Sequence, residues 1–91
     1  MKDPQEMSVA ELRDELRRMG MTNKLIVLAA REMAAAERRA TAARQANYDP
    51  LRAQLFVLKA YGMTNPDLSL NRKGVLFVTL TTREAIESSA A

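Results

Sequence analysis

Arginine and lysine side chains are the groups in this chain whose type and spacing could do chemistry, and that chemistry is anion binding. Guanidinium and ammonium groups hold phosphates through charge-assisted hydrogen bonds. They recur in three segments of the chain, together with one glutamine that could read a base edge. We predict that nucleic acid is bound by Arg31, Arg38, Arg39, Arg52, Gln54, Lys59, Arg72 and Lys73. Double-stranded DNA is the expected partner.

Catalytic chemistry has few candidate residues in the same sequence. The chain contains no histidine and no cysteine, so it lacks the commonest base near neutral pH, a thiol nucleophile and the usual zinc ligands. Its three glycines are isolated and form no phosphate-binding loop. We therefore predict a non-enzymatic protein with no catalytic residues, no metal site and no cofactor.

The length of 91 residues predicts a single domain. Residues 1–7 and 88–91 are expected to be disordered. Hydrophobic residues make up 47% of the chain but aromatic residues only 4%, so the core of a monomer should be thin. Small domains without disulfides or metals are commonly reinforced by oligomerisation. We therefore expect a homodimer. The net charge of +3 favours a polyanionic partner, although the same charges also fit a solvated surface.

Localisation can be read from what the sequence lacks. No apolar run approaches the ~20 residues that a membrane-spanning helix needs, and the polar, acidic start is unlike a secretory signal. The absence of cysteine fits a reducing compartment. We expect a cytoplasmic protein of a bacterium or a bacterial virus that has no membrane partner.

The first helix is predicted by its capping residues. Ser8 and Glu11 form a capping box, and Gly20 ends the helix as a left-handed cap. The helix–glycine–helix step over residues 16–26 has the spacing of a DNA-reading helix-turn-helix, but any capped helical hairpin has it too. Gly-Met-Thr-Asn occurs at residues 20–23 and again at 62–65, which shared capping chemistry explains.

The second predicted helix is long and rich in alanine. It should begin at Thr22 or Asn23 and run to about residue 46, because alanine, arginine and glutamate all favour helix. Its apolar stripe changes from large side chains to alanines along its length. This alanine end would let another helix approach closely, either the third helix or a second copy of the chain. The predicted protein interface consists of Ala36, Ala40, Ala43 and Phe56.

A third helix is predicted over residues 50–61, started by Asp49-Pro50 and ended by Gly62. Phe56 falls on its outward side beside Arg52 and Lys59. Burial in a dimer interface explains an outward phenylalanine better than base stacking does.

After Pro66 the pattern suggests extended structure. Leu68–Leu70 and Val75–Leu80 are predicted to form a β-hairpin whose basic tip, residues 71–74, contains Arg72 and Lys73. A short helix would follow from Thr81 to Ile86. The expected fold is mainly α with a C-terminal β-hairpin, in the order α-α-α-β-β-α, helix-turn-helix or winged-helix-like, around a long alanine-rich central helix.

Residues 50–86 resemble the recognition helix and wing of winged-helix regulators of the MarR type. The resemblance rests on the amphipathic helix ending in Gly62-Met63, the basic hairpin tip, and the strand ending in Leu80-Thr81. It implies that Arg72 and Lys73 reach a groove of DNA from the wing, while the helix over 50–61 meets base edges. The long alanine-rich helix departs from the compact three-helix arrangement of that family.

Two functions follow from these patterns. The first is a small, dimeric DNA-binding regulatory protein whose cations neutralise phosphates. The second is an adaptor or inhibitor of bacterial-virus type that docks on a host protein through its helical surface and Phe56.

Overall fold

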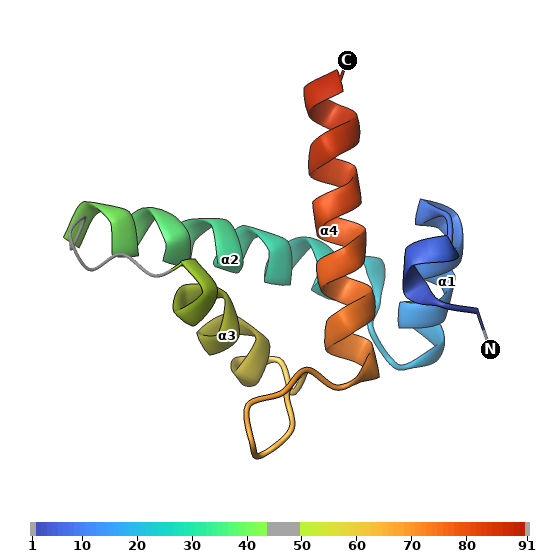
Figure 1. The fold of residues 1–91 in the computed structure, drawn as a ribbon, viewed down its shortest axis with the longest axis horizontal. Helices are drawn as coiled ribbons and strands as arrows, with labels where there is room; N and C mark the ends of the chain where they lie inside the picture. Colours follow the sequence, from blue (N-terminus) through green and yellow to red (C-terminus); the bar gives the residue numbers. More distant parts are fainter. Residues whose placement is uncertain (1, 44–49, 91) are drawn as a thin grey trace.

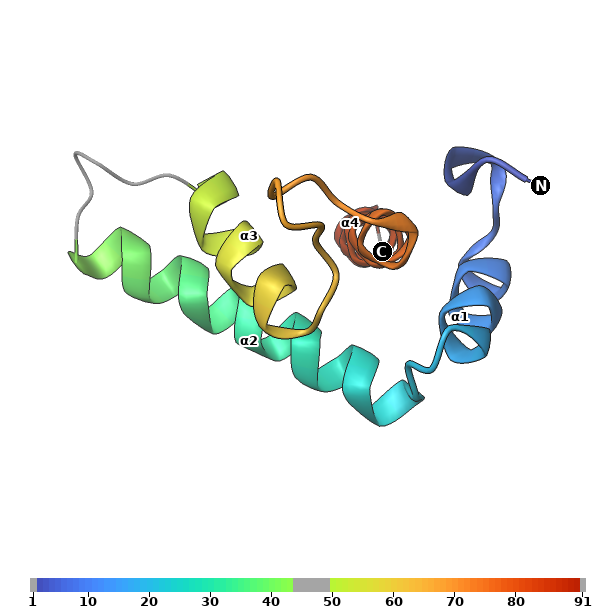
Figure 2. The same ribbon diagram turned by 90° about the horizontal axis from the view of Figure 1, so that it is seen from below.

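The computed structural model describes residues 2–43 and 50–90, whose regular secondary structure is helical (Figure 1). A short 3-10 helix, η1 (Pro4–Glu6), precedes the α-helices α1 (Val9–Arg18), α2 (Asn23–Ala43), α3 (Pro50–Ala60) and α4 (Arg72–Ala90). Helix α1 packs on α4, α2 packs on α3, and η1 rests on α4. Seen from below, α4 stands between the α2–α3 pair and α1 (Figure 2).

The predicted start of the first helix is confirmed at the level of its hydrogen bonds. The Glu11 amide donates to Ser8 Oγ at 3.2 Å, and the Ser8 amide donates to Glu11 Oε1 at 3.1 Å. This reciprocal pair satisfies two backbone amides that a helix N-terminus leaves without partners. Thr22 caps α2 in a similar way, because its Oγ1 accepts from the Leu25 amide at 3.2 Å.

Both Gly-Met steps end helices by the same geometry, as their shared sequence predicted. Gly20 and Gly62 have φ of 97° and 70°, the left-handed region that favours glycine. The following amides turn back, from Met21 to the Leu16 carbonyl at 2.9 Å and from Met63 to the Leu58 carbonyl at 2.8 Å. Both methionines are buried. Each cap therefore also anchors its connecting loop in the core.

The predicted β-hairpin is wrong. The described residues contain no β-strand, and Thr64 and Leu70 form only an isolated bridge in the loop before α4. The segment read as a basic tip, a strand and a separate short helix is instead one helix, α4, from Arg72 to Ala90. Without a hairpin there is no wing, so the winged-helix expectation is wrong as well.

Burial explains why helix prevails over the β-branched composition of this segment. Leu76, Phe77 and Leu80 are fully buried, and their spacing of i, i+1 and i+4 places them on one side of a helix. The helix is started by Asn71, whose Oδ1 accepts from the Gly74 amide at 2.9 Å. Threonine hydroxyls bond back to the preceding turn, as in the 2.8 Å bond from Thr79 Oγ1 to the Val75 carbonyl.

The helix-turn-helix expectation is also corrected. Helices α1 and α2 are joined by a short turn, but they do not pair with each other, since α1 packs on α4 and α2 on α3. A DNA-reading helix-turn-helix needs its two helices packed as one unit. The single core is instead shared by all four helices, with Leu12, Leu16, Leu58, Met63 and Phe77 among its fully buried side chains.

The alanine stripe of α2 packs against the rest of the protein. Ala29 is fully buried, and Ala36 and Ala40 are partly buried on the same side. Small side chains here let α3 lie close. The third helix was one of the two partners that we expected to approach these alanines, the other being a second copy of the chain. The side chain of Ala43 and residues 44–46, the predicted end of this helix, lie outside what the structure describes.

The N-terminal residues contribute to the core. Met7, which follows η1, is buried in the hydrophobic core. Arg83 of α4 fastens η1 by donating hydrogen bonds to the carbonyl oxygens of Met7 and Gln5. The disorder expected for residues 1–7 and 88–91 stays a prediction.

Candidate binding surface

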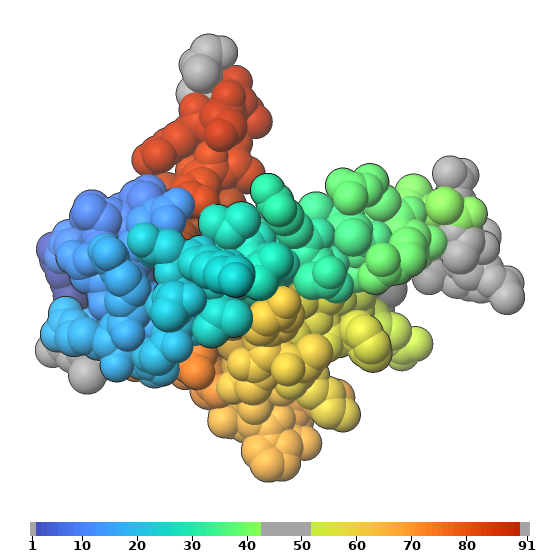
Figure 3. Space-filling model, turned by 180° about the vertical axis from the view of Figure 1, so that it is seen from behind, coloured from blue at the N-terminus to red at the C-terminus, as the bar shows by residue number. Residues whose placement is uncertain are grey.

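The outward side of α2 carries a line of cations. Lys24, Arg31 and Arg38 are spaced by seven residues, so they recur on one side of the helix about every 10.5 Å. All three are exposed, on the side opposite buried Ile26 and Met33. We call these three residues the cationic row. The space-filling view from behind shows α2 crossing the middle of the molecule between α1 and α3 (Figure 3).

Within the described part of the chain, no member of the cationic row forms an ion pair. Lys2 and the three arginines of α1 are different, because each has an acidic partner, whereas Arg72, Lys73 and Arg83 of α4 form no ion pair within the described residues. The ion pairs of Lys2 and α1 are Lys2–Glu11 and Arg18–Glu15, both at 3.0 Å, with Arg13–Glu84 and Arg17–Asp14. The cationic row of α2 therefore differs from α1, whose arginines are each paired with a carboxylate.

Apolar and acidic side chains border the cationic row. Val27 and Leu28 lie on either side of it and are 44% and 40% exposed. Glu32 and Arg39 are exposed on the Leu28 side of the helix. The row is thus a strip of exposed positive charge whose neighbours are apolar side chains together with Glu32 and Arg39.

Helix α3 presents a second, separate basic side. Arg52 and Lys59 are exposed there, and Phe56 between them is 73% exposed. Because α2 and α3 pack on each other through their buried sides, their outward sides point in different directions. Gln54 is not on this outward side. It lines a groove of about 350 Å³ between α2, α3 and α4, together with Met33, Glu37 and Thr81.

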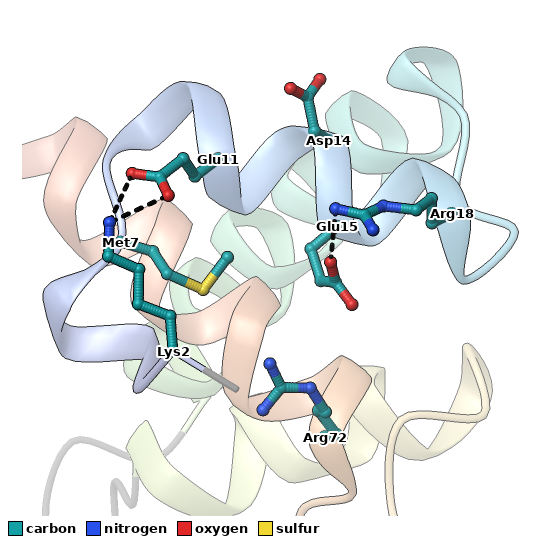
Figure 4. A pocket seen from close by; sticks show the side chains of 7 residues that line it. All are labelled: Lys2, Met7, Glu11, Asp14, Glu15, Arg18 and Arg72. Carbon is teal, nitrogen blue, oxygen red and sulfur yellow. Dashed lines mark hydrogen bonds and ion pairs between the residues drawn. The ribbon is translucent and has the colours of Figure 1, made fainter.

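Arg72 belongs neither to the cationic row of α2 nor to the basic side of α3. It is the first residue of α4, and its guanidinium points into a hollow beneath α1 (Figure 4). This α1 hollow, of about 240 Å³, is lined by Lys2, Met7, Glu11, Asp14, Glu15, Arg18 and Arg72. Arg72 Nε is buried and has no hydrogen-bond partner within the described residues. Lys73, next to it, is half-buried.

The α1 hollow is balanced in charge, with three cations and three carboxylates among its lining residues. The amide of Ser8 and the ammonium of Lys2 both bond to Glu11, which lowers the pKa of that carboxyl below its ordinary value. Glu11 therefore stays ionised near neutral pH, and its negative charge opposes the entry of a polyanion. Arg72, predicted to contact DNA from a wing, lies instead beside acidic residues.

The structure thus divides the predicted nucleic-acid-binding residues among several places. Arg31 and Arg38 belong to the cationic row with Arg39 beside it, Arg52 and Lys59 lie on α3, and Gln54 and Arg72 line cavities. Sequence reasoning omitted Lys24 from the site. Its seven-residue spacing from Arg31 is the signal that could have found it.

Among the residues that the structure covers, no group of acidic side chains could hold a metal ion. None of the described helices is both long enough and apolar enough to cross a membrane. No protein-family model, curated protein or solved structure matched the chain.

Proposed function

We propose that this is a non-enzymatic, cytoplasmic DNA-binding protein that holds duplex DNA through the outward side of α2. The observation that carries the proposal is the contrast in ion pairing. The cationic row is exposed and, within the described residues, has no acidic partner, whereas Lys2 and the three arginines of α1 are each paired with a carboxylate. Unneutralised cations gain most from phosphates, because binding releases the counterions condensed on DNA.

The shape of α2 supports the same partner. An α-helix fits the major groove of B-DNA, and the cationic row extends over about 21 Å of helix. Ala34, Ala35 and Ala42 lie near Arg31 and Arg38, so the helix can approach a duplex closely there. Lysine and arginine contacts to phosphates fix the position of a protein on DNA without reading its sequence. The proposed binding is therefore independent of sequence.

The test replaces the three cations of the row by glutamine, as Lys24→Gln, Arg31→Gln and Arg38→Gln in one chain. The matched control changes Lys2, Arg17 and Arg18 to glutamine, which removes the same number of positive charges from exposed ion pairs. Affinity is measured by fluorescence anisotropy with a random-sequence duplex in about 50 mM salt. Losing three phosphate contacts should weaken binding by on the order of 10²–10³-fold.

The control should bind within a few-fold of wild type, because its cations are already neutralised by neighbouring carboxylates. An equal loss in both variants would mean that only net charge matters, and the assignment to α2 would fail. If the wild-type protein does not bind any duplex at this salt concentration, DNA is not the partner.

A second candidate function is docking on a protein through α3, and Phe56 is the observation that favours it. A phenylalanine ring that is 73% exposed between two basic residues is unusual on a surface that contacts only water. A partner protein retained by wild type and lost by Phe56→Ser would support docking. DNA binding that is lost in the Phe56→Ser variant would instead extend the DNA-binding surface to α3.

A further inference from the structure

Arg72 carries a charged group that the protein leaves without a partner. Among the buried side-chain nitrogen and oxygen atoms that the structure describes, only Arg72 Nε lacks a hydrogen bond. The guanidinium as a whole forms no ion pair within the described residues. A buried donor on a charged group is unfavourable without an acceptor. An acceptor from outside the protein, either water or a ligand, must therefore meet it.

The α1 hollow, into which Arg72 points, is small and is built from three parts of the chain (Figure 4). Its lining residues come from either side of η1, from α1 and from the start of α4. The packing of α1 and η1 on α4 holds these walls together. The volume of about 240 Å³ lies below the ~300–1,000 Å³ of pockets for drug-sized ligands. The hollow therefore suits a smaller molecule.

Each carboxylate of the α1 hollow already has a cationic partner. The pairs are Glu11–Lys2 and Glu15–Arg18, both at 3.0 Å, and Asp14–Arg17. Arg72 is the lining cation that has no carboxylate within the described residues. One negative group on a ligand would complete the pairing. A carboxylate fits best, because its two oxygens match two N–H donors of a planar guanidinium.

A ligand that carried only negative charge would be repelled by the acidic lining residues. Figure 4 shows the side chain of Glu15 extending from α1 toward the hollow, above Arg72. Glu15 bonds to Arg18 through Oε2, so Oε1 can accept a hydrogen bond from another donor. An ammonium group on the same ligand would find an acceptor there. The arrangement of charge in the hollow therefore favours a ligand that carries both signs.

We propose that the α1 hollow binds a small zwitterion of the α-amino acid class, with its carboxylate on Arg72 and its ammonium on Glu15. Such a ligand adds no net charge to a lining in which three cations and three carboxylates balance. Met7 is the apolar lining residue and lies beside the ligand's side chain. This site is separate from the cationic row of α2, so it adds a second ligand to the proposed DNA binding.

The first test follows the methyl group of Met7 by NMR, with isotopically labelled methionine, while each common α-amino acid is added singly at millimolar concentration. At least one amino acid should shift the Met7 signal until it saturates. The signal of Met33, which lines the separate groove between α2, α3 and α4, should stay unchanged. The same compound without its amino group, or without its carboxylate, should bind about tenfold or more weakly, because one charge-assisted contact is lost.

The second test repeats the titration with variants that keep the wild-type helical circular dichroism. Arg72→Gln should abolish the shift of Met7, and Glu15→Gln, on the other wall, should weaken binding by about tenfold or more. The matched control Lys73→Gln removes the neighbouring charge, which does not line the hollow, and should bind as wild type does.

Three results would overturn the proposal. If no amino acid shifts the Met7 signal of wild type, water is the partner of Arg72. A shift that survives Arg72→Gln would place the ligand elsewhere. Inorganic phosphate that shifts Met7 as strongly as any amino acid would make the hollow a simple anion site. None of these results depends on DNA binding, because no member of the cationic row lines the hollow.

Discussion

Gly74 lies where the first turn of α4 meets the loop that follows α3. A Cβ atom built on this residue would be 2.4 Å from the Met63 carbonyl oxygen, and that oxygen belongs to backbone that cannot move cheaply. The same carbonyl accepts a hydrogen bond from the Asn71 amide at 3.1 Å. Because Gly74 has no side chain, the first turn of α4 can lie directly against the Met63 carbonyl group in the loop that follows α3.

We expect Gly74→Ala to lower the free energy of unfolding by about 1–3 kcal/mol, the usual range for overpacking. The loss should appear even though alanine favours helix by about 1 kcal/mol over glycine. Urea denaturation measures it, with Ser88→Ala on the exposed part of α4 as the control, where the change should stay within about 0.5 kcal/mol. A Gly74→Ala protein as stable as wild type would show that α4 does not pack on this loop.

Single residues were also the scale at which the sequence was most informative. The capping box at Ser8 and Glu11 and the two Gly-Met caps were predicted correctly, because these interactions extend over only a few residues. Asn71 was the misleading residue. An asparagine with a glycine three residues later suits a hairpin turn and a helix N-cap equally well, and the choice depends on whether residues 76–80 face a core.

At the scale of elements, the burial of side chains in α4 distinguishes a helix from the strand that the sequence suggested. In a helix, Phe77 is fully buried while Val75 is 36% exposed. In a strand the two residues would share one side, because side chains alternate with a period of two. The mutational contrast between these neighbours therefore distinguishes the two elements.

We expect Phe77→Ala to cost about 3–5 kcal/mol of stability, as loss of a buried aromatic ring does. Val75→Ala should cost less than about 1 kcal/mol, since that side chain is at the surface. Both are measured by chemical denaturation at equal protein concentration. Equal losses at the two positions would favour the extended structure that the β-branched composition of this segment suggested.

The candidate site was predictable only where it lies within one element. Arg31 and Arg38 could be placed on one side of a helix from their spacing alone. The position of Arg72 could not, because it depends on α1 packing over the start of α4, a contact between residues far apart in the sequence. The outward position of Phe56 followed from helical periodicity and is confirmed by its exposure.

For the whole molecule, the arrangement of charge matters more than its sum. A net charge of +3 is modest. The ion pairs around α1 cancel the charge of its arginines, whereas the cationic row of α2 forms no ion pair within the described residues. A long helix with such a row of outward cations is suited to a polyanion. The central claim is that these cations, rather than the total charge, bind DNA.

The salt dependence of DNA binding tests this claim most directly. Each phosphate neutralised by the protein contributes about −0.9 to the slope of log affinity against log salt. The three cations of the row should therefore supply about −2.7 for every α2 helix on the duplex. Replacing Lys24, Arg31 and Arg38 by glutamine should remove that part of the slope, while the control replacements at Lys2, Arg17 and Arg18 should leave it. A slope unchanged by the α2 variant, or no binding at low salt, would contradict the account.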